Sequence, residues 1–260
     1  MKIKEIARAL ENFAPLPLQE GYDNAGLQIG LTETEVTGAL LCIDVTEAVI
    51  DEAIAKDCNL IVAHHPLIFK GCKTITESNY VERCIVKSIR NDIAIYAAHT
   101  NLDNAAGGVN HMIAQKLGLN MVKPLVPLNQ DENTGSGTIG ELNEPISELD
   151  FLKQVKQTFE VGCLRHNKLS GRLIQKVAVC GGAGDFLIEA AMQNRADVFM
   201  TGEIGYHKYF GHENDLLLVE IGHYESEQYT KDLIYNIIRE ECKTVKIQIS
   251  KVNTNPIKYM

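Results

Sequence analysis

Two adjacent histidines, His64 and His65, end the apolar run of residues 60–63 and precede Pro66. Histidine is the commonest side-chain ligand of metal ions in proteins. Successive side chains of a strand point to opposite faces, so both imidazoles reach one site only where the strand stops. Pro66 favours such a stop, because it cannot donate a ladder hydrogen bond and it restricts the backbone of His65. The motif indicates ligation of one metal ion or of a pair, against the alternative of two hydrogen-bonded core histidines.

Three later segments repeat this arrangement, in which a strand-like apolar run ends in His, Asp or Glu: residues 93–103, 198–207 and 216–227. His223 and Glu227 are four residues apart, a spacing that places both on one helical face. Asp103 supplies a second carboxylate, although taken alone it could equally cap a helix that begins near Gly107. Histidines with carboxylates can hold two divalent cations. The predicted metal ligands are His64, His65, Asp103, His223 and Glu227.

His99, His207 and Glu203 end the same motifs and are candidates for catalytic roles, either in proton transfer or in orienting a ligand imidazole. The chemistry that fits this set is hydrolysis of a small molecule, with a metal-bridging water as nucleophile. The alternative is a metal-binding, metal-delivery or regulatory protein without turnover, because the same ligands would serve that role.

Short apolar strands alternate with helices of about ten residues, which predicts an α/β fold with mostly parallel sheets. Thr46 is a candidate N-cap of the first of these helices. The predicted strands span residues 39–45, 60–63, 93–97, 176–180, 198–201, 216–220 and 245–250, and the predicted helices span residues 47–56, 80–90, 108–117, 149–158, 186–193 and 227–241.

The pattern lapses between Met121 and Glu148, where Pro, Asn, Gly and acidic residues accumulate. We therefore expect a first α/β domain over residues 1–127, with the first three predicted ligands, and a second over residues 128–260, with the other two. Both halves run strand, helix, strand with a polar end, then a further strand with a polar end, which indicates an internal duplication. Ligands of open parallel sheets bind at the carboxyl ends of the strands, so we expect the metal site in the cleft between the domains.

Two other polar segments carry weaker signals. Asp23 and Asn24 lie in a glycine-rich loop, where they could shape turns or bind a ligand. Residues 181–184 (Gly-Gly-Ala-Gly) follow a predicted strand and open a helix, but they lack the G-x-G-x-x-G spacing. Tight packing or turn formation is our interpretation of these glycines.

Composition excludes several classes of protein. The chain has 260 residues with a formal net charge of −9 and no clustered Lys and Arg, which argues against nucleic acid as a partner. Seven cysteines without C-x-x-C spacing indicate reduced core residues. No segment approaches the roughly 20 apolar residues of a membrane span, and no signal-peptide core is present, so we expect a cytoplasmic protein without a membrane partner.

Together the motifs resemble the NIF-three-like family, whose bacterial members are labelled GTP cyclohydrolase 1 type 2 homologues. The resemblance rests on DNAGLQIG (23–30), HHP (64–66), HTNLD (99–103), TGE (201–203) with His207, and HYESE (223–227). It implies two similar α/β domains, a dinuclear centre of zinc, iron or manganese held by the five predicted ligands, and a toroidal homohexamer with sites facing an internal cavity. It also implies a GTP-related hydrolase activity, and the segment 121–148 is too short for the extra domain that some members insert there.

Overall fold

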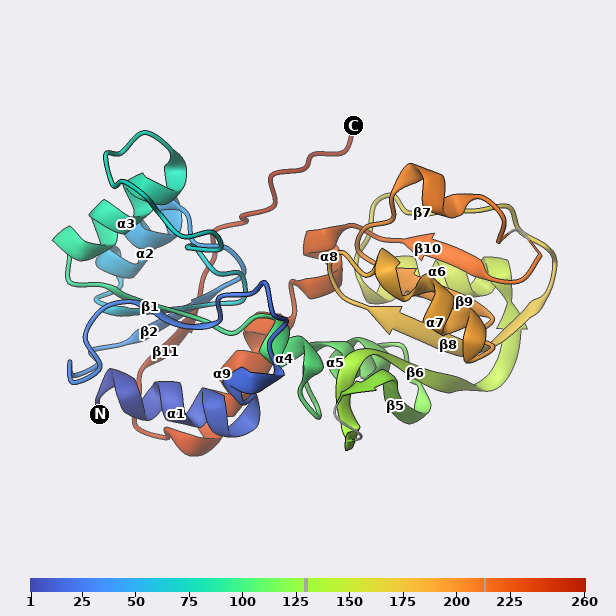
Figure 1. The fold of residues 1–260 in the computed structure, drawn as a ribbon, viewed down its shortest axis with the longest axis horizontal. Helices are drawn as coiled ribbons and strands as arrows, with labels where there is room; N and C mark the ends of the chain where they lie inside the picture. The colour runs from blue at the N-terminus through green and yellow to red at the C-terminus, as the bar shows by residue number, and fades with distance from the viewer. Residues whose placement is uncertain (129–130, 213) are drawn as a thin grey trace. The chain divides into compact units, whose positions relative to one another are not determined.

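The computed structural model describes residues 1–128, 131–212 and 214–260. The chain forms two compact units, each built on a β-sheet with helices packed against it (Figure 1). Unit 1 contains Met1–Leu102 and Tyr229–Pro256, and unit 2 contains Asp103–Gln228 and Ile257–Met260. The predicted α/β class is confirmed. None of the described helices has the length and apolar composition that a membrane span requires.

Unit 1 is a sheet between two pairs of helices. Its strands run in the order β1-β4-β3-β2-β11, with β4, β3, β2 and β11 parallel and β1 antiparallel to β4. They are β1 (Gly26–Ile29), β2 (Ala39–Cys42), β3 (Leu60–Ala63), β4 (Ala94–Ala97) and β11 (Ile247–Ile249). Helices α2 (Glu47–Ala55) and α3 (Tyr80–Arg90) cover one face, and α1 (Ile3–Phe13) and α9 (Thr230–Glu241) cover the other (Figure 1).

Local sequence explains these elements. Strands β2, β3 and β4 are buried along their whole length, as expected for parallel strands with both faces covered. Thr46 caps α2 as predicted, because its hydroxyl accepts the backbone N–H of Val49 at 3.3 Å. The short helix η1 (Leu16–Leu18) follows α1, and the five-residue helix α4 (Thr100–Asn104) follows β4. This places His64 and His99 directly after neighbouring parallel strands.

Unit 2 is built on a mixed sheet with strand order β5-β6-β8-β9-β10-β7. Only β8, β9 and β10 are mutually parallel, and the outer strands pair antiparallel, so the predicted parallel character holds for the centre of this sheet alone. The strands are β5 (Asn120–Leu128), β6 (Asp131–Ser147), β7 (Arg165–His166), β8 (Leu173–Cys180), β9 (Val198–Thr201) and β10 (Leu217–Glu220).

Helices cover both faces of this sheet. Figure 1 shows α7 (Ile188–Gln193) on one face and α6 (Glu148–Thr158) on the other, and α5 (Val109–Lys116) contacts β6 and β8. The short helices are η2 (Asp185–Leu187), η3 (Tyr206–Tyr209) and α8 (His223–Glu227). The predicted helix over residues 227–241 corresponds to α9, which begins at Thr230, whereas Glu227 is the last residue of the preceding helix α8.

The segment 121–148, predicted as an irregular boundary, contains the long strands β5 and β6, which pair antiparallel. Its residues Asn129 and Gln130 lie outside the described part of the chain. Pro124 and Pro127 are tolerated because β5 is an edge strand, and Gly137 adopts a φ of +62°. A segment whose composition is typical of a loop therefore forms two paired strands, with β5 at the edge of the sheet.

The two compact units also divide the chain at other places than the predicted boundary at residues 127/128. The β5–β6 hairpin belongs to the sheet of unit 2, so unit 2 begins at Asp103. Helix α9 returns to pack against α1, and β11 pairs with β2, so residues Tyr229–Pro256 belong to unit 1. Pairings between segments this far apart leave no local trace in the sequence.

Candidate metal centre

His64 follows β3 and its side chain is fully buried. Its Nδ1 lies 2.8 Å from the carbonyl oxygen of Ala98. A carbonyl oxygen can only accept a hydrogen bond, so Nδ1 carries the proton and Nε2 keeps a lone pair. The fold therefore sets the tautomer in which Nε2 is the metal-binding atom.

His65 is oriented by a carboxylate. Its Nδ1 lies 2.7 Å from Oδ1 of Asp44, which follows β2. Burial is the largest single influence on the pKa of Asp44 and would raise it, but the hydrogen bonds from His65 and Thr254 and the charges of the nearby histidines together lower the pKa. Asp44 therefore remains charged and holds the Nδ1–H of His65, the arrangement that metal-ligating histidines commonly show.

His99 has a carboxylate partner of the same kind. Its Nδ1 lies 2.7 Å from Oδ1 of Asp23, and Oδ2 of Asp23 accepts the backbone N–H of Thr100 at 3.1 Å. Burial would raise the pKa of Asp23, but the hydrogen bonds from His99 and Thr100 lower it to about 2. The loop residue Asp23 therefore binds a histidine rather than only shaping a turn.

The three imidazoles of unit 1 form one cluster. The ring centroids of His64 and His65 lie 4.9 Å apart, and each lies 5.4 Å from the ring of His99. The sequence placed His99 near the predicted ligands, and the structure brings all three rings together.

In unit 2, the spacing of His223 and Glu227 puts both on one face of α8. Nε2 of His223 lies 3.2 Å from Oε2 of Glu227, and its Nδ1 lies 2.8 Å from Oε1 of Glu203. Both ring nitrogens thus face carboxylate oxygens. Such an imidazole either is protonated or shares a cation with Glu227 through Nε2.

Asp103 lies in α4 and its backbone carbonyl accepts from Nδ2 of Asn110 at 3.1 Å. Helix α5 begins after Gly108 without a side-chain cap, so Asp103 does not have the alternative role of capping it. Burial, and then the negative charges of Asp103 and Glu227, raise the pKa of the Cys180 thiol well above its ordinary value. Both carboxylates therefore lie close enough to the buried Cys180 to disfavour its thiolate, and Cys180 remains a neutral thiol.

The glycines after β8 pack tightly against these side chains, as the sequence analysis suggested. A Cβ on Gly182 would lie 2.5 Å from Oε1 of Glu227 and 3.2 Å from Nε2 of His223. A Cβ on Gly202 would lie 2.6 Å from the carbonyl oxygen of Gly182. The backbone of residues 181–184 therefore forms a wall beside His223 and Glu227 of α8.

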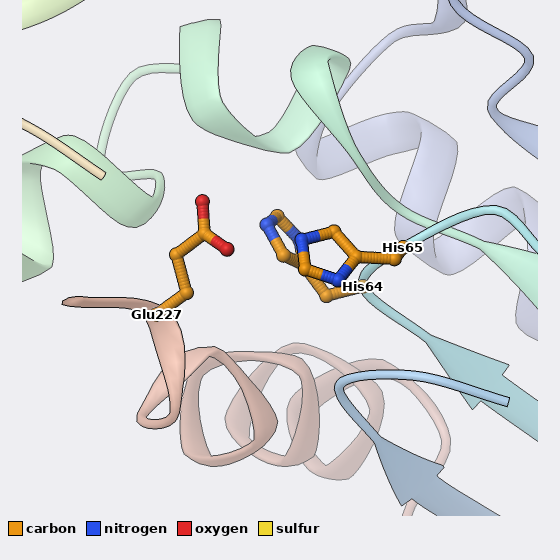
Figure 2. A group of neighbouring side chains, drawn as sticks. All are labelled: His64, His65 and Glu227. Carbon is orange, nitrogen blue, oxygen red and sulfur yellow. The ribbon is translucent and has the colours of Figure 1, made fainter. Parts of the chain in front are cut away.

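His64, His65 and Glu227 form a candidate metal-binding group. One ligand atom from each lies within 4.8 Å of the ligand atoms of the other two, and Figure 2 shows the two rings and the carboxylate turned toward one another. Imidazole nitrogens with carboxylate oxygens are a donor set that zinc, iron and manganese all accept.

The other predicted site residues have different surroundings. Glu203 is exposed, and its Oε1 lies 2.8 Å from Nδ1 of His223. His207 is exposed on η3, where its ring contacts those of Tyr206 and Phe210. Asp44 is not among the site residues predicted from the sequence, although it follows a buried strand, which is the same signal that identified the histidines.

Comparison with known proteins agrees with these motifs. The model of the family Duf34/NIF3 (NGG1p interacting factor 3) matches residues 1–256. A "GTP cyclohydrolase 1 type 2 homolog" of Lactococcus lactis is 35% identical over 98% of both chains, and one of Clostridium perfringens is 33% identical over 100% of both. The crystal structure of Staphylococcus aureus protein SA1388 superposes with a TM-score of 0.91 at 29% identity, covering 100% of this chain and 99% of that one. The protein belongs to the Duf34/NIF3 family.

Proposed function

We propose that His64, His65, Asp103, His223 and Glu227 together hold two divalent cations and that the protein hydrolyses a small molecule there. The observation that carries this proposal is the state of the imidazoles. His64, His65 and His223 each have Nδ1 held by an oxygen acceptor, so each can offer Nε2 to a cation. Core histidines kept for packing alone have no need of this common orientation.

Two cations bound by these residues would supply a water of lowered pKa and a positive field for the charge that develops during hydrolysis. The protein's own residues have separate tasks. Asp44 and Glu203 fix the rings of His65 and His223, and the buried strand ends exclude bulk water from His64. His99, held by Asp23 and in ring contact with both His64 and His65, is the candidate for moving a proton at Nε2.

A groove in unit 2 supports a purine nucleotide as the substrate class, in keeping with the relatives named GTP cyclohydrolase 1 type 2 homolog. The groove has a volume of about 710 Å³ and is lined by Leu164, Arg165, His166, Asn167, Lys168, Tyr206, Tyr209 and Phe210. Exposed aromatic rings stack on nucleobases, and Lys and Arg attract phosphates. None of the described residues that line it is acidic, in a chain of net charge −9.

Glu220 holds the walls of this groove together. Its carboxylate accepts hydrogen bonds from Arg165 at 2.9 Å and from the Tyr209 hydroxyl at 3.0 Å. It also accepts the backbone N–H of Ile204, one residue after Glu203. Arg165 is thus partly neutralised, which leaves Lys168 as the stronger site for a phosphate. The groove and the His223–Glu203 pair are built on the same end of β10.

Metal content tests the proposed centre. The full-length protein, purified without added metal, is expected to contain about two equivalents of a divalent metal, and His65→Ala and Glu227→Ala are expected to lose metal. His166→Ala is the matched control, because His166 is an exposed histidine on β7. Retention of all metal in both ligand variants, or a parent protein without metal, would overturn the centre.

Turnover separates hydrolysis from metal storage or delivery. Metal-loaded protein is incubated with GTP, and His99→Gln is expected to keep its metal while losing most of the rate, since proton transfer contributes about 10²-fold or more. Absence of turnover with GTP and related nucleotides, at full metal loading, would favour the alternative of a metal-binding, delivery or regulatory protein.

We also propose that the protein assembles with itself as a toroidal homohexamer, which rests on family membership. Light scattering of the purified protein tests this assembly, and a monomeric mass would contradict it.

A further inference from the structure

The C-terminal tail is anchored to unit 1 just before it reaches the histidine cluster. After β11, the backbone N–H of Ser250 donates to the carbonyl of Leu41 at 2.8 Å, and that of Lys251 donates to Glu52 at 3.0 Å. The Ser250 hydroxyl also donates to Glu52, and Val252 packs against the hydrophobic core. The position of Thr254, two residues later, is therefore set by a well-anchored segment.

Thr254 completes the hydrogen bonding of the carboxylate that orients His65. Its hydroxyl donates to Oδ2 of Asp44 at 2.6 Å, while Oδ1 of the same carboxylate accepts from His65 Nδ1 at 2.7 Å. The side chain of Asp44 is one-third exposed, and a carboxylate with a single partner can rotate about its terminal bond. With both oxygens engaged, the plane of the carboxylate and the ring of His65 are fixed together.

The same arrangement of threonine, aspartate and histidine occurs a second time in unit 1. There Thr100 donates to Asp23, which accepts from His99. Thr100 is the neighbour of His99 in the chain, so that triplet is local. Thr254 is 210 residues from Asp44, so its bond exists only while the tail is docked.

We propose that Thr254 is a positioning residue of the metal centre, and that the C-terminal tail acts as a latch that holds His65 through Asp44. This inference rests on the proposed metal centre. A docked tail then raises the metal affinity of His65. By reciprocal linkage, a bound metal stabilises the docked tail to the same extent, because both act through the Asp44 carboxylate. Release of the tail loosens His65 and speeds metal exchange, so the tail regulates how firmly the metal is held.

The test uses full-length protein stripped of metal and titrated with Zn²⁺ against a chromophoric chelator. Thr254→Val removes the hydroxyl while keeping the shape of the side chain, and it is expected to weaken zinc binding about 3- to 10-fold. This is less than the roughly 10- to 100-fold cost of losing a direct partner of a ligand. Thr254→Ser keeps the hydroxyl and is expected to restore parental affinity.

Two controls distinguish positioning from a general change of structure. Asn253→Ala alters the neighbouring tail residue, whose side chain accepts from Asn255, and is expected to bind zinc like the parent. All metal-free variants are expected to unfold cooperatively, and Thr254→Val is expected to lose no more stability than one hydrogen bond contributes. In the background of Asp44→Asn, Thr254→Val is expected to have no further effect, because the two residues act through one bond.

The failure of the latch can be told from the failure of the metal centre. If Asp44→Asn weakens zinc binding but Thr254→Val does not, the latch is overturned and the centre stands. If the parent binds no zinc, the metal centre is overturned. Crystal structures of the metal-free parent and of metal-free Thr254→Val then test whether Thr254 positions Asp44 and His65. An unchanged Asp44 and His65 in Thr254→Val would overturn the latch, whereas a rotated carboxylate with a reoriented ring would support it.

Discussion

At the scale of single residues, the site depends on what holds the far side of each imidazole. His64 uses a backbone carbonyl, which cannot change its protonation state. His65, His99 and His223 use carboxylates, which add negative charge behind the ring and raise the basicity of Nε2. If the proposed centre forms, it would therefore combine one imidazole held by a rigid backbone carbonyl with imidazoles whose basicity depends on a carboxylate partner.

The pair of Asp23 and His99 predicts a pH dependence of stability. The pKa of Asp23 is about 2 in the folded protein and near 3.9 in an unfolded chain. Because the folded value is the lower one, Asp23 contributes stability that is complete above about pH 4 and is lost as the pH falls toward 2. The difference in melting temperature between the parent and Asp23→Asn is expected to stay constant from pH 7 to about 5 and to shrink below pH 4. A difference that grows on acidification would contradict this assignment.

At the scale of elements, both units deliver their polar groups by the same means. In each, three neighbouring parallel strands follow one another in the chain, and the third is followed by a five-residue helix, α4 or α8. Helix α4 carries Asp103 four residues after His99, and α8 carries Glu227 four residues after His223. This shared order supports the expectation of an internal duplication.

The wall beside α8 makes Gly182 a sensitive position. Gly182→Ala is expected to push Glu227 away from His223 and to weaken metal binding, because the added Cβ would meet Oε1 of Glu227 at 2.5 Å. It would also cost about 1 kcal/mol for a φ of +61°. Zinc titration and thermal unfolding measure the two effects separately.

Gly171→Ala is the matched control for this variant. Gly171 also has a positive φ, of +82°, but a Cβ there would meet nothing within 4 Å. The Gly171→Ala variant is expected to lose a similar amount of folding stability, because alanine also disfavours this positive φ, and to keep its metal affinity. Equal metal affinities in the two variants would show that the wall of residues 181–184 does not set the ligand geometry.

At the scale of the whole molecule, the chain passes from unit 1 to unit 2 and back near the proposed ligands. The first crossing lies at Leu102 and Asp103, and the second at Gln228 and Tyr229. Two carboxylates of the proposed centre, Asp103 and Glu227, thus lie within two residues of a crossing.

This organisation predicts which fragments fold. A fragment of residues 1–127 lacks α9 and β11, so the buried face of α1, with Ile3, Ile6 and Leu10, loses its helical partner, and β2 loses a neighbouring strand. It is expected to show no cooperative thermal transition in circular dichroism, whereas residues 103–228, which contain the whole sheet of unit 2, are expected to show one. Cooperative unfolding of residues 1–127 would instead support a division of the chain at residue 127.

The sequence by itself determined the strands that lead into the candidate site and the polar residues that follow them, whereas the short helices α4 and α8 were not among the predicted elements. The buried strands β3, β9 and β10 are continuous apolar runs, and the residues at their ends are the only polar groups that such runs could carry into a site. The i,i+4 spacing of His223 and Glu227 is likewise a local property of a helix. These features depend on neighbours in the chain, which a sequence displays directly.

Only the tertiary structure decided the partners of the histidines and the limits of the two units. Asp44 meets His65 across 21 positions of the chain, and Thr254 meets Asp44 across 210. The edge hairpin of β5 and β6 and the return of α9 and β11 to unit 1 are also pairings between distant segments. Such contacts arise from the packing of whole elements, and the periodicity of any one segment carries no information about which other segment it will meet.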